Sequence, residues 1–293
     1  MKARTWLELG RVSNLPTVLS NVLCGAALSG ETWRPVPLSF AVLSGALFYE
    51  GGMFLNDAFD ADIDAKERPE RPIPSGRASR RTVLGLGLAL LGMGSVVLAV
   101  LGFSGMAPGG ASLPLAGAVT ALAVIAYDRW HKGRAWSPLV MGLCRAGLYF
   151  IGAFAVAENV EIGLVLAAFA LFCYVVGLTH VARFENATAV GRAWPTLLVF
   201  LPVALALASP IAHVAAGRPM LALAAVSIAW SLRSLAFARR GGRNIGRAVV
   251  TLIAGISLLD AVFAASRAAL PLALGCVACW GLTLLLQRAV RGT

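Results

Sequence analysis

Residues 36–69 read VPLSFAVLSGALFYEGGMFLNDAFDADIDAKERP, an apolar run that passes directly into a run of carboxylates. The apolar part, 36–56, has about the 20 residues that a helix needs to cross the bilayer core. If this helix continues beyond its apolar part, Asp57, Asp60 and Asp64 lie on one face, because they are spaced three and four residues apart. The stretch therefore predicts a membrane-spanning helix that ends in an acidic face.

The remainder of the chain repeats this apolar pattern. Its 293 residues are 58% hydrophobic and 13% charged, and the mean hydropathy is +0.78, whereas a soluble domain carries about 25% charged residues. Apolar runs are found at about 13–30, 36–56, 82–102, 112–127, 138–157, 161–180, 195–216, 219–238, 247–265 and 268–287. These runs predict an all-α membrane protein, a multi-span helical bundle of ten helices, with residues 1–293 forming a single transmembrane domain.

Most of the 25 lysine and arginine residues fall in alternate loops between the predicted spans. Because positively charged loops stay in the cytoplasm, this alternation predicts that both termini and the acidic face are cytoplasmic. The bias, together with a site for an anionic substrate, explains the net charge of +11, so no nucleic-acid partner is expected. The first apolar segment contains Asn14, Pro16 and Asn21, which predicts a retained span rather than a cleaved signal peptide. The abundant alanine, glycine and arginine favour a bacterial inner membrane.

Three carboxylates on one helix face repel one another unless a cation lies between them. Magnesium is the natural cation, since it prefers oxygen ligands and is often held by one or two carboxylates plus substrate phosphates. A solvated acidic loop would explain the polarity, but neither the spacing nor the position at the end of an apolar span. We therefore interpret Asp57, Asp60 and Asp64 as magnesium ligands at a diphosphate site, with Asn56 on the same face as Asp60.

The loop that follows, RPERPIPSGR at 68–77, is rich in proline and arginine. Its prolines and glycine stiffen the backbone, and Arg68 and Arg71 are suited to clamp phosphate oxygens with two hydrogen bonds each. A positive-inside bias alone would account for the arginines but not for the prolines.

The string Asn-Asp-x-x-Asp-x-x-x-Asp at 56–64, followed by Arg-Pro-x-x-Ser-Gly at 71–76, resembles the first aspartate-rich motif of the UbiA superfamily of intramembrane prenyltransferases. The resemblance covers most of the chain. It implies a bundle that usually has nine spans, so the expected architecture is nine to ten transmembrane helices. It also implies a magnesium cofactor, a prenyl diphosphate substrate and a hydrophobic or aromatic acceptor in the lipid membrane.

Two further segments are similar to parts of the same family. The segment RVSNLP at 11–16 is similar to its opening segment, where an asparagine faces the active site. That match implies a substrate-binding role for Asn14, with Arg11 or Asn21 as alternatives. The segment YDRWHK at 127–132 lies where the family carries a tyrosine and a basic residue, and the resemblance implies that Lys132 contacts the diphosphate.

The chain departs from the family at its second aspartate-rich motif. The corresponding stretch at 174–186 contains no aspartate, and Glu185 is its single carboxylate. Glu185 and Asn186 are candidate oxygen ligands, and Arg183 is a candidate replacement for the charge of a metal ion. His180 is either a general base for the acceptor or a polar residue at a helix end. The string Ala-Arg-Phe-Glu-Asn at 182–186 and the Cys-Arg pair at 144–145 resemble an EboC-like branch of the superfamily.

Four charged residues fall inside predicted spans, where such residues usually find a partner in the bundle. We expect Glu50 to pair with Arg145 or Arg233. We expect Asp260 to pair with Arg233 or Arg267. Contact with the substrate is the alternative for these residues, and Arg145 is the one that we assign to substrate binding.

The resemblance implies a magnesium-dependent transferase, a prenyltransferase of the UbiA family. Charges at the acidic face would stabilise the leaving diphosphate while the prenyl C–O bond ionises, and an acceptor would then attack the allylic cation. The alternative is a transporter or lipid-handling membrane protein that keeps the fold without transferase chemistry. The first motif favours the enzyme, and the changed second motif favours the alternative.

Overall fold

The computed structural model describes residues 3–30, 34–184, 194–208 and 217–290. The described part of the chain is helical and contains no strand, which confirms the predicted all-α class. Its α-helices are α1 (Ala3–Gly10), α2 (Leu15–Leu28), α3 (Pro35–Glu67), α4 (Arg80–Phe103), α5 (Ser112–Trp130), α6 (Ser137–Val156), α7 (Ile162–Ala182), α8 (Leu201–Ala208), α9 (Gly217–Arg239), α10 (Arg243–Ser266) and α11 (Leu270–Ala289). Two 3₁₀-helices, η1 (Val12–Asn14) and η2 (Trp194–Val199), complete the described elements.

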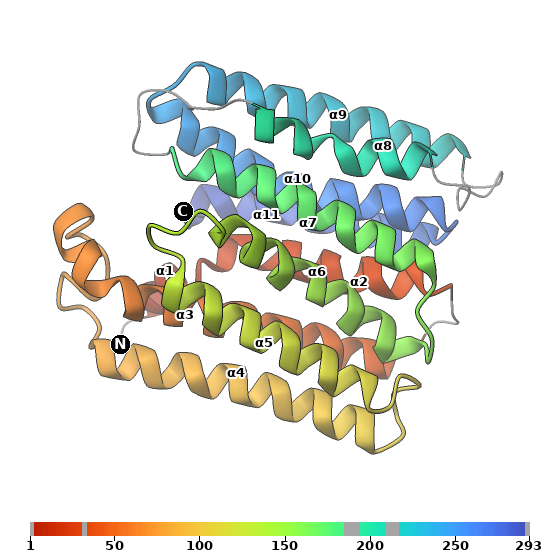
Figure 1. Ribbon diagram of the computed structural model, residues 1–293, viewed down its shortest axis with the longest axis horizontal. Coiled ribbons are helices and arrows are strands. Elements are labelled where there is room, and N and C mark those ends of the chain that lie inside the picture. Colours follow the sequence, from red (N-terminus) through yellow and green to blue (C-terminus); the bar gives the residue numbers. More distant parts are fainter. Residues whose placement is uncertain (1–2, 31–33, 185–193, 209–216, 291–293) are drawn as a thin grey trace.

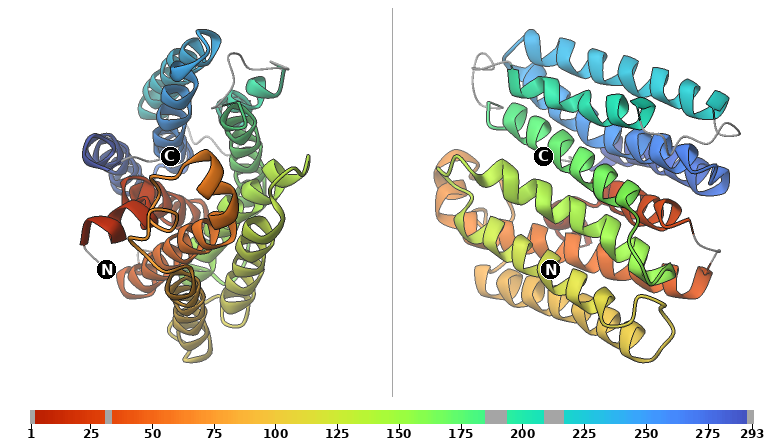
Figure 2. Two further views of the ribbon diagram at one scale, coloured as in Figure 1. Left: turned by 90° about the vertical axis from the view of Figure 1, so that its left-hand side faces the viewer. Right: turned by 45° about the vertical axis from the view of Figure 1, so that its right-hand side comes forward.

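The long helices run side by side along the long axis of the molecule (Figure 1). Helices α4 and α9 form two opposite edges of the bundle, while α2, α6, α7 and α10 lie between them (Figures 1 and 2). The α3–α4, α5–α6 and α9–α10 connections lie at the same end of the bundle, on the left in Figure 1. The acidic end of α3 and the basic loops are therefore gathered at one end.

The short helix α2 lies deep in the bundle because small residues let its backbone approach α6. A Cβ atom on Gly25 would lie 2.1 Å from the backbone oxygen of Tyr149. In return, a Cβ atom on Gly152 would lie 2.0 Å from the backbone oxygen of Val22. Close backbone approach at small residues is the usual way in which membrane helices pack. This contact holds α2 and α6, which both carry candidate site residues, at a fixed separation.

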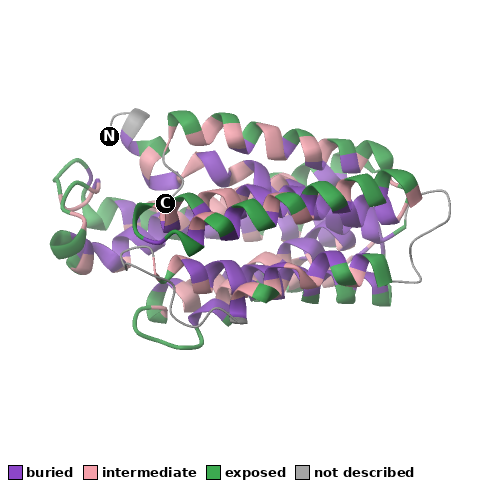
Figure 3. Ribbon diagram, turned by 90° about the horizontal axis from the view of Figure 1, so that it is seen from above, coloured by how far each residue is buried: buried purple, intermediate pink, exposed green. Residues whose placement is uncertain are grey.

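Seven described helices are long and apolar enough to cross a membrane, namely α3, α4, α6, α7, α9, α10 and α11. Exposed leucine, valine and methionine side chains cover the outer faces of α4, α5 and α11, whereas α10 is largely buried (Figure 3). This distribution is expected of a bundle that faces lipid on its outside. The described part of 195–216 forms only η2 and α8, and the count of nine to ten spans stays a prediction.

At the acidic end, α1 and the loop after α3 pack onto the outside of α3. Leu9 is fully buried beside Phe54, and the rings of Trp6 and Phe54 are 4.8 Å apart. Arg77 donates a hydrogen bond of 2.5 Å to Glu8, which ties the loop to α1. The Ser79 hydroxyl caps α4 by accepting from the backbone N–H of Thr82. These contacts fix the arginine-containing loop over the carboxylates of α3.

Candidate active site

The acidic face predicted from the sequence is present, because α3 continues as a helix through Glu67. Asp57, Asp60 and Asp64 are 5%, 4% and 3% exposed, although they lie in the most polar part of the helix. Asp62, between them in the sequence, points outward and forms an exposed ion pair of 3.0 Å with Arg80. The three-residue and four-residue spacing has therefore separated three buried carboxylates from one exposed carboxylate on the same helix.

Two arginines neutralise two of the buried carboxylates. The guanidinium of Arg71 bridges Asp57 and Asp64, with N···O distances of 3.2 and 2.9 Å. Arg11 lies 3.2 Å from the same oxygen of Asp57 and 3.4 Å from the amide oxygen of Asn56. Burial is the largest single influence and acts to lower the pKa of Arg11, but Asp57, Tyr49, Tyr127 and Asp64 together outweigh it and hold the pKa above its ordinary value. Arg11 also has the left-handed backbone φ of 44°, a strained conformation of the kind found at functional sites.

The third carboxylate, Asp60, is neutralised from the end of α5. The ammonium of Lys132 lies 3.3 Å from Asp60, and Nε2 of His131 lies 3.5 Å from the same oxygen. His131 stacks on the ring of Tyr127, with 4.7 Å between the ring centres. The structure thus brings the predicted Lys132 to the predicted aspartates, from a separate helix.

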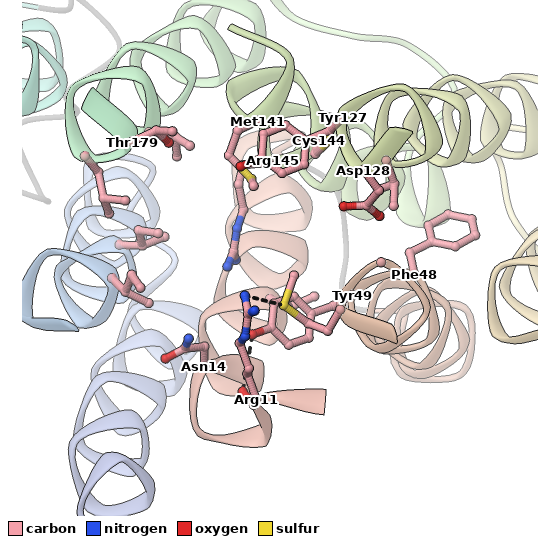
Figure 4. A pocket seen from close by; sticks show the side chains of 18 of the residues that line it. Arg11, Asn14, Phe48, Tyr49, Tyr127, Asp128, Met141, Cys144, Arg145 and Thr179 are labelled. Carbon is pink, nitrogen blue, oxygen red and sulfur yellow. Dashed lines mark hydrogen bonds between the residues drawn. The ribbon is translucent and has the colours of Figure 1, made fainter. Parts of the chain in front are cut away.

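A cavity of about 260 Å³ opens beside this charged cluster (Figure 4). Arginines gather along it, and apolar side chains of α2, α6, α7 and α10 form most of its deeper wall. The positively charged lining residues are Arg11, Arg68, Arg71 and Arg145, and the apolar ones include Val18, Leu148, Val175, Ile253 and Ile256. A cavity with one cationic end and one apolar end fits an amphiphilic anion such as a prenyl diphosphate.

The residues at the acidic face fit a divalent cation by their chemistry. Buried carboxylate and amide oxygens are the ligands that magnesium prefers, and the guanidinium of Arg71 lies between Asp57 and Asp64 where a bridging positive charge is needed. Among the described residues, no three Asp, Glu, His or Cys side chains stand close enough together to share one ion. The three aspartates contact basic side chains instead, so their role as magnesium ligands stays a prediction.

Several predicted substrate-binding residues meet at the cavity. Asn14, Arg68, Arg71 and Arg145 all line it. Asn14 accepts a hydrogen bond of 3.2 Å from Gln287 of α11, and Arg145 donates to Thr17 and Asn21 of α2 at 3.0 and 3.1 Å. The first apolar segment is therefore part of the cavity wall, as the sequence predicts.

Two predicted residues at the end of α7 do not reach the cavity, although Thr179 and Ala182 beside them line it. Neither His180 nor Arg183 is among the described residues that line the cavity. Arg183 donates hydrogen bonds to the backbone oxygen of Arg134 and to the hydroxyl of Ser137, so it fastens α7 to the α5–α6 connection. Glu185 and Asn186 lie outside the described residues. The roles predicted for His180 and Arg183 are not supported by a position on the cavity wall, and those of Glu185 and Asn186 stay predictions.

The expected pairing of the buried charges is wrong in each case. Asp260 pairs with neither Arg233 nor Arg267, because Arg233 lies over aromatic rings and Arg267 binds Glu161 at 2.8 Å. Arg145 binds neutral side chains of α2 and lies 5.7 Å from the ring centre of Tyr49, and no described residue forms an ion pair with Glu50. Pairing depends on which helices are neighbours, and the sequence does not reveal that arrangement.

Tyr49 and Asp128 also line the cavity, and the sequence alone assigned no role to either. Tyr49 donates a hydrogen bond of 3.2 Å to the backbone oxygen of Arg11, which supports the strained turn. Asp128 lies on α5 only four residues before Lys132, so the same helical spacing that links the aspartates of α3 was the available signal.

Residues 18–240 match the sequence profile described as the UbiA prenyltransferase family. The chain belongs to the UbiA prenyltransferase family. This UbiA protein is an integral membrane protein, since its relatives and its apolar helices both indicate a membrane location. The family expected from the aspartate-rich string is thereby confirmed.

Curated relatives of this UbiA protein include two archaeal enzymes named digeranylgeranylglyceryl phosphate synthase. The Ignicoccus hospitalis enzyme is 42% identical over 127 residues, which are 43% of this chain and 38% of that enzyme. The Metallosphaera sedula enzyme is 32% identical over 157 residues, which are 53% of this chain and 52% of that enzyme. The chain therefore spans about half or less of the length of these curated relatives.

Solved structures of UbiA proteins share the fold over nearly the whole chain. A UbiA homologue from Archaeoglobus fulgidus, solved with GPP and Mg²⁺, has a TM-score of 0.65 at 14% identity and covers 91% of this chain and 99% of its own. A UbiA homologue from Aeropyrum pernix in its apo form has a TM-score of 0.65 at 18% identity and covers 85% and 96%. At these identities the likeness shows the fold.

Proposed function

We propose that this UbiA protein catalyses the magnesium-dependent transfer of a prenyl group from a prenyl diphosphate to an acceptor within the membrane. One observation carries the proposal. Three buried aspartates, each matched with a basic side chain, lie at the cationic end of a cavity whose deeper wall is apolar. This arrangement provides for a diphosphate at one end and a hydrocarbon chain at the other.

The diphosphate would bind at the cationic end. Arg68 and Arg71 lie on the cavity wall and donate to phosphate oxygens. Lys132, whose side chain is 45% exposed, is able to turn from Asp60 towards the substrate. Magnesium, held by Asp57, Asp60 and Asp64, would add positive charge that stabilises the leaving diphosphate. The prenyl chain would lie along the apolar wall, sheltered from water.

Transfer then proceeds by charge stabilisation and exclusion of water. The bond between the prenyl carbon and the diphosphate oxygen breaks, and its electron pair leaves with the diphosphate. The acceptor forms the new bond to that carbon and loses a proton. Since the named relatives are synthases of digeranylgeranylglyceryl phosphate, a glyceryl phosphate lipid is the first acceptor to test. Aromatic acceptors are the second class.

The same proposal puts the cavity mouth on the cytoplasmic side of the membrane. The loops at this end of the bundle, α3–α4, α5–α6 and α9–α10, contain clusters of arginine and lysine. Positively charged loops are retained in the cytoplasm. The relatives that match are archaeal, so we propose a cytoplasmic membrane without restricting it to bacteria.

The proposal is tested by the binding of farnesyl and geranylgeranyl diphosphate to the purified protein in detergent, with and without magnesium. We expect magnesium-dependent binding, and we expect Asp60→Ala to weaken it by at least about thirtyfold, the scale of losing one partner in a buried charge pair. Asp62→Ala is the matched control, since it removes the same charge from the exposed side of the same helix.

Two results would reject the proposal. The first is diphosphate binding that does not need magnesium, and the second is an equal response of the Asp60 and Asp62 variants. Magnesium-independent uptake of a lipid by the intact protein in vesicles would then favour a transporter or lipid-handling role.

A further inference from the structure

Asp128 is the only carboxylate among the described residues that line the cavity. It lies near the end of α5 and is 3% exposed. Figure 4 shows its carboxylate projecting from α5 into the space between α3 and α6. A carboxylate buried on a cavity wall needs a partner in that cavity, because burial of an unpaired charge is costly.

The contacts of Asp128 leave one oxygen without a partner. Its Oδ1 accepts a long hydrogen bond of 3.4 Å from the amide of Asn56. Its Oδ2 is buried and has no hydrogen-bond partner. In the described part of the chain Asp128 forms no ion pair, whereas each of the three buried aspartates of α3 does. The carboxylate of Asp128 thus has an unused ligand atom.

Further oxygen ligands lie on the neighbouring helix α3, where Asn56 contacts Asp128. Asp128, His131 and Lys132 are three and four residues apart, so they share the face of α5 that meets α3. His131 and Lys132 contact Asp60. Asp128 contacts Asn56, which lies one helical turn before Asp60. The acidic face of α3 and Asp128 of α5 therefore meet where these two helices contact each other, with Asp128 on the cavity wall.

We propose that Asp128 and Asp60, with the side chain of Asn56 between them, form a divalent-cation subsite across α3 and α5. Magnesium is the chemical class that fits, since it takes hard oxygen ligands from one or two carboxylates and completes its shell with phosphate and water. This subsite is one part of the proposed magnesium site, and Asp57 and Asp64, which Arg71 bridges, form its other part. The inference rests on the proposed diphosphate site and assigns it a ligand outside α3.

The competing account is a carboxyl group with a purely structural role. In that case the removal of its charge would alter stability and leave metal binding unchanged. The substitution Asp128→Asn separates the two accounts, because the new amide keeps the shape and still offers an oxygen to Asn56. Glu50→Gln is a matched control, since Glu50 also has a buried carboxylate oxygen without a partner but does not line the cavity.

The test is the binding of Mn²⁺ to the purified full-length protein in detergent with inorganic pyrophosphate, measured by electron paramagnetic resonance. Mn²⁺ is a suitable probe because it shares the oxygen-rich octahedral sites of magnesium. We expect Asp128→Asn to lower the Mn²⁺ affinity by at least about tenfold, since even outer-shell partners of a metal typically contribute that much. Glu50→Gln should bind Mn²⁺ as the wild type does.

Thermal unfolding in EDTA provides the second measurement. We expect Asp128→Asn to unfold at or above the wild-type temperature, because the variant removes a buried charge that has no counter-ion. Unchanged Mn²⁺ affinity, or a variant that is unstable in EDTA, would overturn the subsite. If Asp60→Ala loses Mn²⁺ and Asp128→Asn does not, only this inference fails. If the wild type binds no Mn²⁺ with pyrophosphate, the proposed function fails with it.

Discussion

Two groups of buried acidic side chains in this bundle are held in opposite ways. At the end of α3, Asp57, Asp60 and Asp64 contact arginine, lysine and histidine side chains. In the second half of α10, Asp260 is fully buried, and the hydrogen bonds that it accepts from described residues come from neutral side chains. It accepts from Ser20 at 2.5 Å, from Asn21 at 2.9 Å and from Tyr149 at 2.6 Å.

The difference separates a site that exchanges ligands from one that holds helices together. Long basic side chains at the edge of the bundle are able to turn from a carboxylate to a bound phosphate, so their ion pairs are replaceable. The hydroxyl and amide donors around Asp260 come from α2 and α6 and are fully buried in a packed interior, so they are not free to turn to a ligand. The first group is therefore expected to govern binding, and the second is expected to govern stability.

The largest effect is expected for Asp260→Ala, which leaves three buried donors without their acceptor. Each unsatisfied group costs about 1–3 kcal/mol, less in a membrane, so the free energy of unfolding should fall by about 2–4 kcal/mol. Denaturant unfolding in detergent, followed by circular dichroism, measures this change. The folded variant should bind prenyl diphosphate as the wild type does. A loss of affinity without a loss of stability would assign Asp260 to the binding site.

A smaller effect is expected for Arg71→Gln, which should weaken the binding of prenyl diphosphate and strengthen the binding of Mn²⁺. The prenyl diphosphate should bind about tenfold more weakly, since a hydrogen bond to a charged group contributes about 1.5–3 kcal/mol. Mn²⁺ alone should bind more tightly, because Asp57 and Asp64 lose the cation that they share. Titration with each ligand measures both changes.

The matched control for Arg71 is Arg77→Gln, which removes an arginine of the same loop that binds Glu8 instead. It should alter neither titration. Weaker binding of both ligands in the Arg71 variant would mean that Arg71 positions the aspartates rather than competing for them.

Much of the site follows from spacing within one helix. The three-residue and four-residue intervals in α3 predicted the buried aspartates, and the outward position of Asp62 followed from the same geometry. The resemblance to the family predicted that Asn14 faces the cavity and that Lys132 lies at the acidic face of α3. Local periodicity and a specific motif were sufficient for these features because each depends on one segment of chain.

The remaining features depend on which helices are neighbours. The partners of Asp260 lie about 110 and 240 residues away in the chain, so no local pattern relates them. We expected Asp260 to pair with an arginine, but the residues around it in the bundle are serine, asparagine and tyrosine. The predicted span at 195–216 begins as a 3₁₀-helix, which is followed by a short α-helix. Pro195 and Pro202 lie near the beginnings of these two helices. Proline has no N–H to donate, so a single continuous α-helix through Pro202 would lose a hydrogen bond.

The smallest effect is expected at the end of α7, where the sequence predicts a substrate-binding role for Arg183. Its side chain is exposed and donates to Arg134 and Ser137 rather than to the cavity. Arg183→Gln should therefore change the affinity for prenyl diphosphate by less than about twofold, the scale of substitutions away from a site. The same magnesium-dependent binding measurement tests this. A loss of more than about tenfold, comparable with that of Arg71→Gln, would mean that the Arg183 side chain turns towards the cavity when the substrate binds. In that case the basic side chains that can turn from a protein partner to a bound phosphate would include Arg183 at the end of α7, in addition to those that contact the aspartates of α3.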